Sequence, residues 1–237
     1  MICTGTMAGF LCRLGTFQAQ RRAEQRRGLD RQLRHIRSQL PLFRQQRRAY
    51  EARVAPRFNV FRVLRLERKE VLVHTPMLAE LLDPQGAHGQ GFLFLGSFLE
   101  MLRSLAPKPL PSTHEGHQWF VETEKPTGSH GNLDVLITSP TLGCLLAIEN
   151  KVGAGEQREQ LYRYWCWLRK QRRRLPHQIL IFLTPEGREA ETARSAKYTR
   201  LSYHTDICPW LQAVLPRVKS PAVSETVGQY VRICEDS

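Results

Sequence analysis

Three charged residues lie in or directly after apolar runs, where burial of a charge is costly. Asp134 falls within the run 132–137, and Glu149 and Lys151 follow the apolar run 144–148. Because an unpaired buried charge costs several kcal/mol, each must have a partner. Two carboxylates and an ammonium could hold a Mg²⁺ ion and position a water molecule for hydrolysis of a phosphate ester. The alternative is a structural ion pair of Lys151 with one of the two carboxylates.

The pattern of apolar residues predicts the elements that carry these side chains. Alternation of polar and aliphatic residues over 132–137 predicts a strand with Asp134 opposite the aliphatic face. The uninterrupted run 144–148 predicts a strand buried on both faces. The two-residue period of that strand places Glu149 and Lys151 on one side. The order of strands and helices along the chain predicts an α/β fold with a mixed sheet flanked by helices.

Length, charge and cysteine usage narrow the class of protein. The chain has 237 residues, 41% of them hydrophobic, and a formal net charge of +13. No stretch approaches the roughly 20 apolar residues that span a bilayer, so a cytoplasmic protein without a membrane segment is expected. The excess of Lys and Arg favours a polyanionic partner such as nucleic acid over a merely solvated basic surface. The six cysteines form no CxxC pair, which argues against zinc.

These residues and a second block together resemble a known enzyme family. Asp134, then Glu149-Asn150-Lys151, then Gln160 and Tyr164 on a following helix resemble the signature of the PD-(D/E)XK nuclease superfamily, with leucine rather than proline before the aspartate. HTPMLAELLDP at 74–84 and GAHG at 86–89 resemble the HSxxLxxLLDPxGxHG block of one family within it, whose D…ENK…QLxRY block also matches.

The resemblance implies a metal-dependent nuclease that hydrolyses phosphodiester bonds in nucleic acid, with DNA favoured, in a setting such as defence or repair. It implies a restriction-endonuclease-like domain over residues 56–237, with a basic, helical or partly disordered extension over 1–55. Mg²⁺, or Mn²⁺ in its place, would be held by Asp134, Glu149 and the backbone carbonyl of Asn150. Lys151 would orient or deprotonate water or stabilise charge on the phosphate, and Gln160 would reach the metal-bound water or Lys151.

Several neighbouring residues are assigned less directly. Many members of the superfamily contribute an acidic residue from an early helix, and Glu70 is the preferred candidate over Glu80. Tyr164 could contact a phosphate or belong to the core stripe of its helix. Either Glu122 or Glu124 could line the cleft, and His74 and His88 are expected to be hydrogen-bonding anchors rather than catalysts. The run 58–70 is expected to be one helix capped by Asn59, and Thr75 to cap the next helix.

The N-terminal region and two other interpretations of function remain open. Residues 18–53 are rich in Arg and Gln, and Leu29, Leu33, Ile36 and Leu40 share one helix face that Pro41 should kink or end. This helix could follow a phosphate backbone or pack on its own domain, and a homodimer or a partner protein is compatible with it. The other functions are a non-catalytic nucleic-acid-binding module on the same fold, and a nucleotide-binding loop at 153–155.

Overall fold

The computed structural model describes residues 5–105 and 110–236. The chain divides into two units, Met1–Phe58 and Asn59–Ser237. Among the helices of the described residues, none is both long and apolar enough to cross a membrane.

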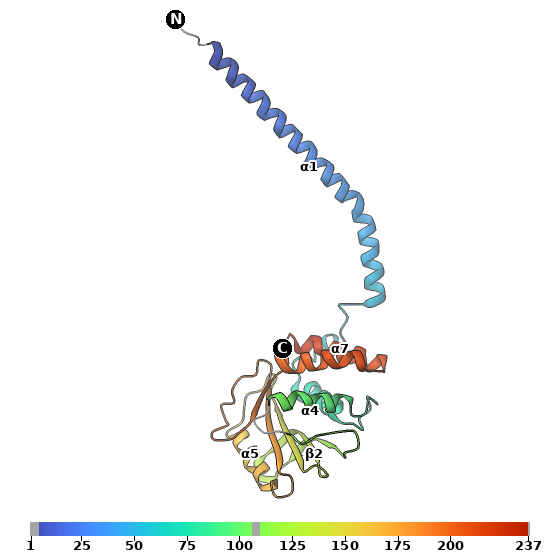
Figure 1. The fold of residues 1–237 in the computed structure, drawn as a ribbon, viewed down its shortest axis with the longest axis vertical. Coiled ribbons are helices and arrows are strands. Elements are labelled where there is room, and N and C mark those ends of the chain that lie inside the picture. The colour runs from blue at the N-terminus through green and yellow to red at the C-terminus, as the bar shows by residue number, and fades with distance from the viewer. Residues whose placement is uncertain (1–4, 106–109, 237) are drawn as a thin grey trace. The chain divides into compact units, whose positions relative to one another are not determined.

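The first unit consists mainly of one helix, α1 (Gly5–Val54), whose ribbon bends along its length (Figure 1). The helix continues through Pro41, so of the two outcomes expected at that residue, a kink or an end, the end is wrong. Proline removes one backbone hydrogen bond and crowds the preceding turn. Good helix formers such as Gln, Arg and Leu on both sides allow the helix to continue at that cost.

The second unit is built on a five-stranded mixed sheet in the order β1-β2-β3-β4-β5. The strands are β1 (Phe120–Pro126), β2 (Asn132–Ser139), β3 (Cys144–Asn150), β4 (His177–Thr184) and β5 (Thr199–Ser202). β1, β2 and β3 pair antiparallel, whereas β4 runs parallel to β3 and β5 parallel to β4. Every residue of β3 is buried, as the uninterrupted apolar run predicts.

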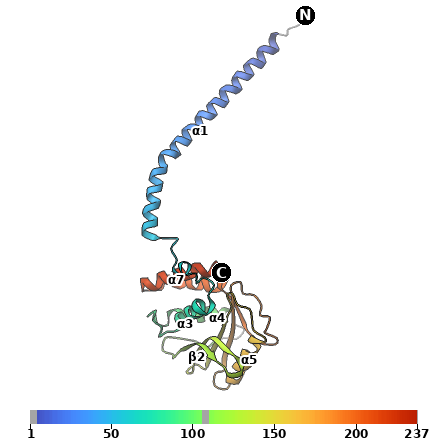
Figure 2. The same cartoon turned by 180° about the vertical axis from the view of Figure 1, so that it is seen from behind.

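Helices cover both faces of this sheet and make three layers. The helices of this unit are α2 (Val60–Val63), α3 (Thr75–Leu82), α4 (Leu93–Leu105), α5 (Gln160–Gln171), α6 (Cys208–Val214) and α7 (Pro221–Cys234). Leu146 and Ile148 of β3 pack in the cluster that includes α3, α4, α6 and α7, whereas Leu145 and Ala147 pack in the cluster under α5. Figures 1 and 2 show α4 and α7 on one side of the sheet and α5 on the other.

Short turns complete the framework where the regular helices stop. Two π-helical turns, η1 (Glu70–His74) and η3 (Tyr203–Ile207), lead directly into α3 and α6. Two 3₁₀ turns, η2 (Gly128–His130) and η4 (Leu215–Arg217), connect β1 to β2 and follow α6.

Candidate active site

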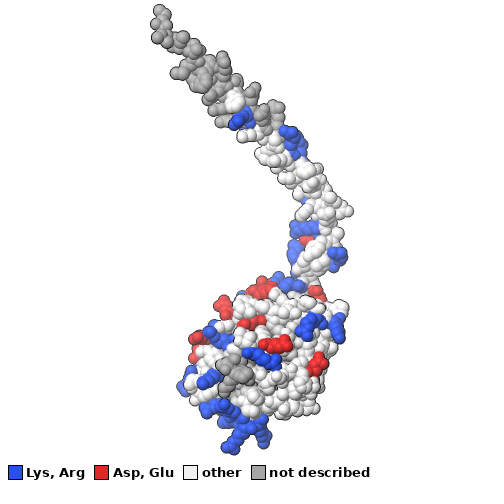
Figure 3. Space-filling model, in the orientation of Figure 1, with Lys and Arg blue, Asp and Glu red and all other residues white. Residues whose placement is uncertain are grey.

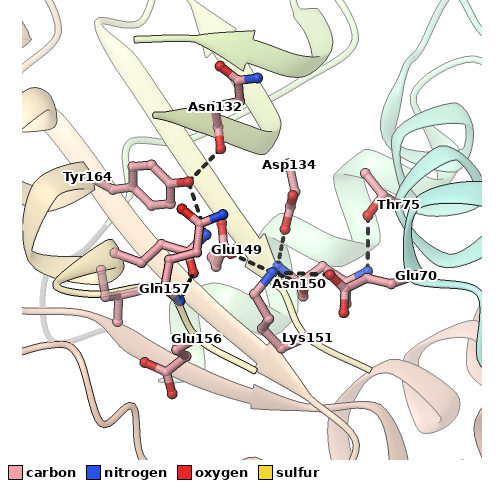
Figure 4. Close-up of polar contacts among 12 residues, drawn as sticks. Glu70, Thr75, Asn132, Asp134, Glu149, Asn150, Lys151, Glu156, Gln157 and Tyr164 are labelled. Carbon is pink, nitrogen blue, oxygen red and sulfur yellow. Dashed lines mark hydrogen bonds and ion pairs between the residues drawn. The ribbon is translucent and has the colours of Figure 1, made fainter. Parts of the chain in front are cut away.

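Two carboxylates, Glu149 at the end of β3 and Glu70 of η1, contact the ammonium of Lys151 (Figure 4). Asp134 of β2 lies close enough for its charge to act on that ammonium. Val135 of β2 pairs with Ile148 of β3, so the next facing positions of the antiparallel pair are Asp134 and Glu149. Lys151 Nζ lies 2.8 Å from Glu149 Oε1 and donates a hydrogen bond of 3.3 Å to the carbonyl oxygen of Asn150. The structure therefore brings together the three residues that the sequence singles out first.

Glu70 reaches the same ammonium from the start of η1. Lys151 Nζ donates to Glu70 Oε1 at 3.1 Å, and the backbone N–H of Val152 donates to Glu70 Oε2 at 2.8 Å. Both side chains of this ion pair are about nine-tenths buried, with exposed fractions of 9% and 10%. The alternative candidate, Glu80, accepts instead from the backbone N–H of His88 in the glycine-rich loop.

The path of the chain to Glu70 differs from the continuous helix expected over 58–70. Asn59 caps α2 as predicted, accepting from two backbone N–H groups, but α2 ends at Val63. Arg65 then takes a left-handed conformation with φ 57°. This break separates α2 from the π-helical turn that carries Glu70. No glycine or proline in the stretch indicates it.

Asn150 connects the sheet to the helical layer beside the site. Its backbone N–H donates to Asp134 Oδ2 at 2.7 Å, which fixes that carboxylate. Its side chain donates to Thr75 Oγ1 at 3.2 Å and accepts from the Tyr203 hydroxyl at 3.0 Å. Thr75 is thus a partner of Asn150 and the first residue of α3, not its N-cap as expected. His74 occupies the N-cap position, and its side chain forms no capping hydrogen bond. No sequence pattern indicated that Tyr203 would contact Asn150.

Burial gives the two central carboxyls unusual proton affinities. Burial raises the pKa of Glu149 to about 8, and the charge of Asp134 adds to the rise although Lys151 opposes it. Burial likewise raises the pKa of Asp134 to about 6, against the lowering effects of Lys151 and the Asn150 N–H. Burial alone would lower the pKa of Lys151, but Glu149 and the other carboxylates outweigh it and raise that pKa above its ordinary value.

Glu149 carries the least satisfied carboxylate of the group. Its side chain is 1% exposed and its Oε1 forms the ion pair with Lys151. Its Oε2 accepts no hydrogen bond from any described residue. A buried carboxylate in this condition is costly, which makes it a site of strong attraction for a further cation.

Gln160 and Tyr164 form the border of the site on α5. Gln160 donates to the Tyr164 hydroxyl at 3.2 Å and accepts from the backbone N–H of Gln157, and Tyr164 donates to the carbonyl of Asn132 at 2.5 Å. Burial raises the pKa of Tyr164 to about 12, and the charge of Glu149 contributes to that rise. The structure thus directs the hydrogen bonds of Gln160 to the loop and to Tyr164, and it is Tyr164 whose hydroxyl lies close enough to Glu149 for the charge to affect it.

The structure also distinguishes between the roles considered for the two histidines, the two glutamates of β1 and the loop 153–155. His74 bonds the Tyr230 hydroxyl and the Glu67 carbonyl, and His88 bonds the Asp83 carbonyl, so both are hydrogen-bonding anchors, as predicted. Glu124 is the carboxylate of β1 that raises the pKa of Asp134, whereas Glu122 pairs with Lys125. Helix α5 begins only at Gln160, so the loop 153–155 lacks the adjoining helix N-terminus on which a phosphate would bind.

The donor set suits a hard divalent cation. Within the ranges that the structure describes, no three His, Cys, Asp or Glu side chains are already arranged around a metal position. The ammonium of Lys151, however, already lies among oxygens of Glu70, Glu149 and Asn150, and Oε2 of Glu149 has no hydrogen-bond donor among the described residues. Carboxylate and carbonyl oxygens are the ligands that Mg²⁺ and Mn²⁺ prefer.

Comparison with known families agrees with this geometry. Residues 58–232 match the PD-(D/E)XK nuclease superfamily, and the chain belongs to it. The five-stranded mixed sheet flanked by helices is consistent with the fold of that superfamily, which confirms the predicted fold class. No match was found among curated proteins or among solved structures.

Proposed function

We propose that this member of the PD-(D/E)XK nuclease superfamily is a metal-dependent phosphodiesterase that cleaves nucleic acid, with DNA as the favoured substrate. The observation that carries the proposal is the Glu149 carboxylate, which is buried opposite Asp134. Its Oε1 contacts Lys151, and its Oε2 has no hydrogen-bond donor among the described residues. A buried carboxylate with so few compensating partners is typical of a site that binds a charged ligand.

Asp134, Glu149 and the carbonyl oxygen of Asn150 would hold Mg²⁺ or Mn²⁺, with Glu70 beside them. When bound, such a cation supplies charge neutralisation at the phosphate and lowers the pKa of a water molecule. The N–H of Asn150 keeps one Asp134 oxygen in place through its 2.7 Å hydrogen bond, which leaves the other oxygen available to a ligand.

Lys151 is suited to stabilise negative charge on the reacting phosphate. Its raised pKa keeps it protonated at neutral pH, so in this state it acts as a cation and hydrogen-bond donor rather than as a base. Glu70 holds the ammonium in position through the 3.1 Å hydrogen bond. Gln160 positions the loop before α5 by accepting from the backbone of Gln157.

The charge of the chain supports a polyanionic substrate. Its formal net charge is +13, and Figure 3 shows Lys and Arg side chains gathered at the end of the second unit where α5 ends. Five basic residues follow one another closely there, namely Arg169, Lys170, Arg172, Arg173 and Arg174. Such a surface binds phosphates without reading sequence.

A cleavage assay tests the proposal. Purified protein is incubated with single-stranded, double-stranded and branched DNA and with RNA, in EDTA, in Mg²⁺ and in Mn²⁺. We expect cleavage only with metal, and we expect Asp134→Asn to abolish it while nucleic-acid binding persists.

The matched control is Glu122→Gln, which removes an exposed carboxylate of β1 whose partner is Lys125, and it should cut as wild type does. If the wild type binds nucleic acid but cuts none of the substrates with either metal, the protein is a binding module and the proposal is wrong.

A further inference from the structure

Helix α1 carries an apolar stripe with a seven-residue repeat. From residue 29 to residue 54 the spacing alternates between four and three residues, and seven of the eight positions are apolar. These are Leu29, Leu33, Ile36, Leu40, Phe43, Tyr50 and Val54, with Arg47 at the eighth position. On α1 taken by itself, the seven side chains are between 40% and 68% exposed. An apolar stripe of this length requires a partner to cover it.

We propose that α1 pairs with α1 of a second copy of this chain as a parallel, two-stranded coiled coil over residues 29–54. A helix that packs on a globular domain shows a broader apolar face, because three or four positions in every two turns are apolar. Here the stripe keeps to two positions in every seven, the narrow seam of a coiled coil. In heptad notation Leu33, Leu40 and Val54 are at position a, and Leu29, Ile36 and Phe43 are among those at position d. The inference does not depend on cleavage activity.

The residues that flank the seam favour a parallel pair. Position g holds Gln32, Gln39, Gln46 and Arg53, and position e holds Asp30, Arg37, Arg44 and Glu51. In a parallel pair each g residue contacts the e residue of the partner's next heptad, so each glutamine meets a charged group to which it can hydrogen-bond. In an antiparallel pair e faces e, which would bring Arg37 against Arg44 of the second copy.

Arg47 is the one polar residue of the seam, and its charge is already paired within its own helix. Its Nε donates to Glu51 Oε1 at 3.0 Å, which draws the guanidinium toward the flank of the stripe. A hollow of about 450 Å³ lies at the same place, lined in part by Phe43, Gln46 and Tyr50, and it could receive a side chain of the second helix. A single polar a residue sets register and strand number, and each additional strand would add another guanidinium to the seam.

The other arginines of this stretch need not oppose pairing. Arg31, Arg34 and Arg48 occupy positions f and b, on the side of the helix away from the seam. Pro41 is also at position b, so the residue that disturbs the helix lies outside the contact. The basic side thereby stays free for phosphates in a dimer, which fits the expected association with nucleic acid.

The mass of the full chain in solution tests the pairing. Sedimentation equilibrium or light scattering over a wide concentration range should give twice the chain mass of 27.4 kDa. Leu33→Asp should weaken the dimer by at least about a hundredfold in Kd, because each dimer loses two buried leucines and gains two charges. Leu42→Asp is the matched control, since Leu42 is as exposed as Leu33 (58% against 54%) but is at position c. It should leave the mass unchanged.

Two further variants separate loss of pairing from misfolding and test whether the two helices run parallel. Arg47→Leu should tighten the dimer by about tenfold or more, a gain that misfolding would not produce. Leu29→Cys should form an interchain disulfide under copper–phenanthroline more readily than wild type, because a parallel pair places the two residues side by side. A chain that is monomeric at every concentration, or equal masses for Leu33→Asp and Leu42→Asp, would overturn the pairing. Failure of the Leu29→Cys crosslink in a confirmed dimer would overturn its parallel direction.

Discussion

Replacement of Glu149 by glutamine should make the metal-free protein more stable, although Glu149 lies in the proposed active site. The carboxylate is fully buried. Its Oε1 contacts the Lys151 ammonium, and its Oε2 has no hydrogen-bond donor among the described residues. Its pKa is raised from 4.5 to about 8, first by burial and then by Asp134. The folded protein therefore holds a proton on Glu149 at neutral pH, and glutamine imitates that protonated form.

The size of the effect follows from the difference between the folded and unfolded pKa. Because the pKa is raised on folding, the stability associated with Glu149 is greatest below about pH 4.5 and is lost as the pH rises to about 8. At pH 7 the unfolded chain has released the proton and the folded chain retains it, which costs about 3 kcal/mol. The buried glutamine amide of the variant lacks hydrogen-bond partners, which costs about 1 kcal/mol and reduces the gain in stability by that amount. Glu149→Gln should thus raise the free energy of unfolding by about 2 kcal/mol at pH 7 and by little at pH 4.5.

Urea unfolding in EDTA from pH 4.5 to pH 8 measures this difference. Wild type and Glu149→Gln should converge at the acid end and diverge as the pH rises. Glu122→Gln, which removes an exposed ion pair with Lys125, should follow wild type within about 0.5 kcal/mol. Mn²⁺ or Mg²⁺ should then stabilise wild type and leave Glu149→Gln nearly unchanged. A variant no more stable than wild type at pH 8 in EDTA would refute the reasoning, because the carboxylate would then have partners that compensate its burial.

Three further outcomes are expected from substitutions elsewhere in the chain. Lys151→Ala should abolish cleavage and lower the melting temperature in EDTA, because it leaves the buried carboxylate of Glu70 without its cation. Divalent metal should restore more of the melting temperature of this variant than it adds to wild type. Arg34→Gln combined with Arg48→Gln should make DNA binding less dependent on salt and leave the mass of the protein in solution unchanged. The slope of log K against log salt concentration should fall in magnitude by about 0.9 for each phosphate that the helix no longer neutralises. Tyr203→Phe should cost about 1–3 kcal/mol in urea unfolding, because the buried amide oxygen of Asn150 is left without its donor.

The clustering of the charged residues could be predicted from the sequence because the cost of burying them is visible there. Asp134, Glu149 and Lys151 interrupt or end runs of aliphatic residues, and the strand period determines which of them share a side. The register of β2 against β3 then brings Asp134 opposite Glu149. Local pattern is sufficient here, since the residues lie on neighbouring strands joined by a short turn.

The supporting contacts could not be predicted in the same way, because they join segments far apart in the chain. Glu70 is 81 positions from Lys151, and its approach depends on the break after Val63 and on the π-turn. No glycine or proline marks that break, so propensity alone favours a continuous helix. The partner of α1 is equally hard to predict from a short window, because a few apolar residues at helical spacing fit a coiled-coil seam and a domain-packing face alike.

Asn150 shows how the fold supports a group of charges that burial disfavours. Its backbone N–H holds Asp134, its side chain joins Thr75 of α3 to Tyr203 of η3, and its carbonyl oxygen accepts from Lys151. The next residue continues the ladder with β4, because the Lys151 N–H donates to the Leu183 carbonyl at 2.9 Å. The end of β3, with Glu149 in the strand and Lys151 directly after it, is therefore fixed from both the sheet and the helical layer. Burial, and with it repulsion between the carboxylates, can then raise the pKa values of Asp134 and Glu149 without displacing the backbone, which is the condition that the proposed cation site requires.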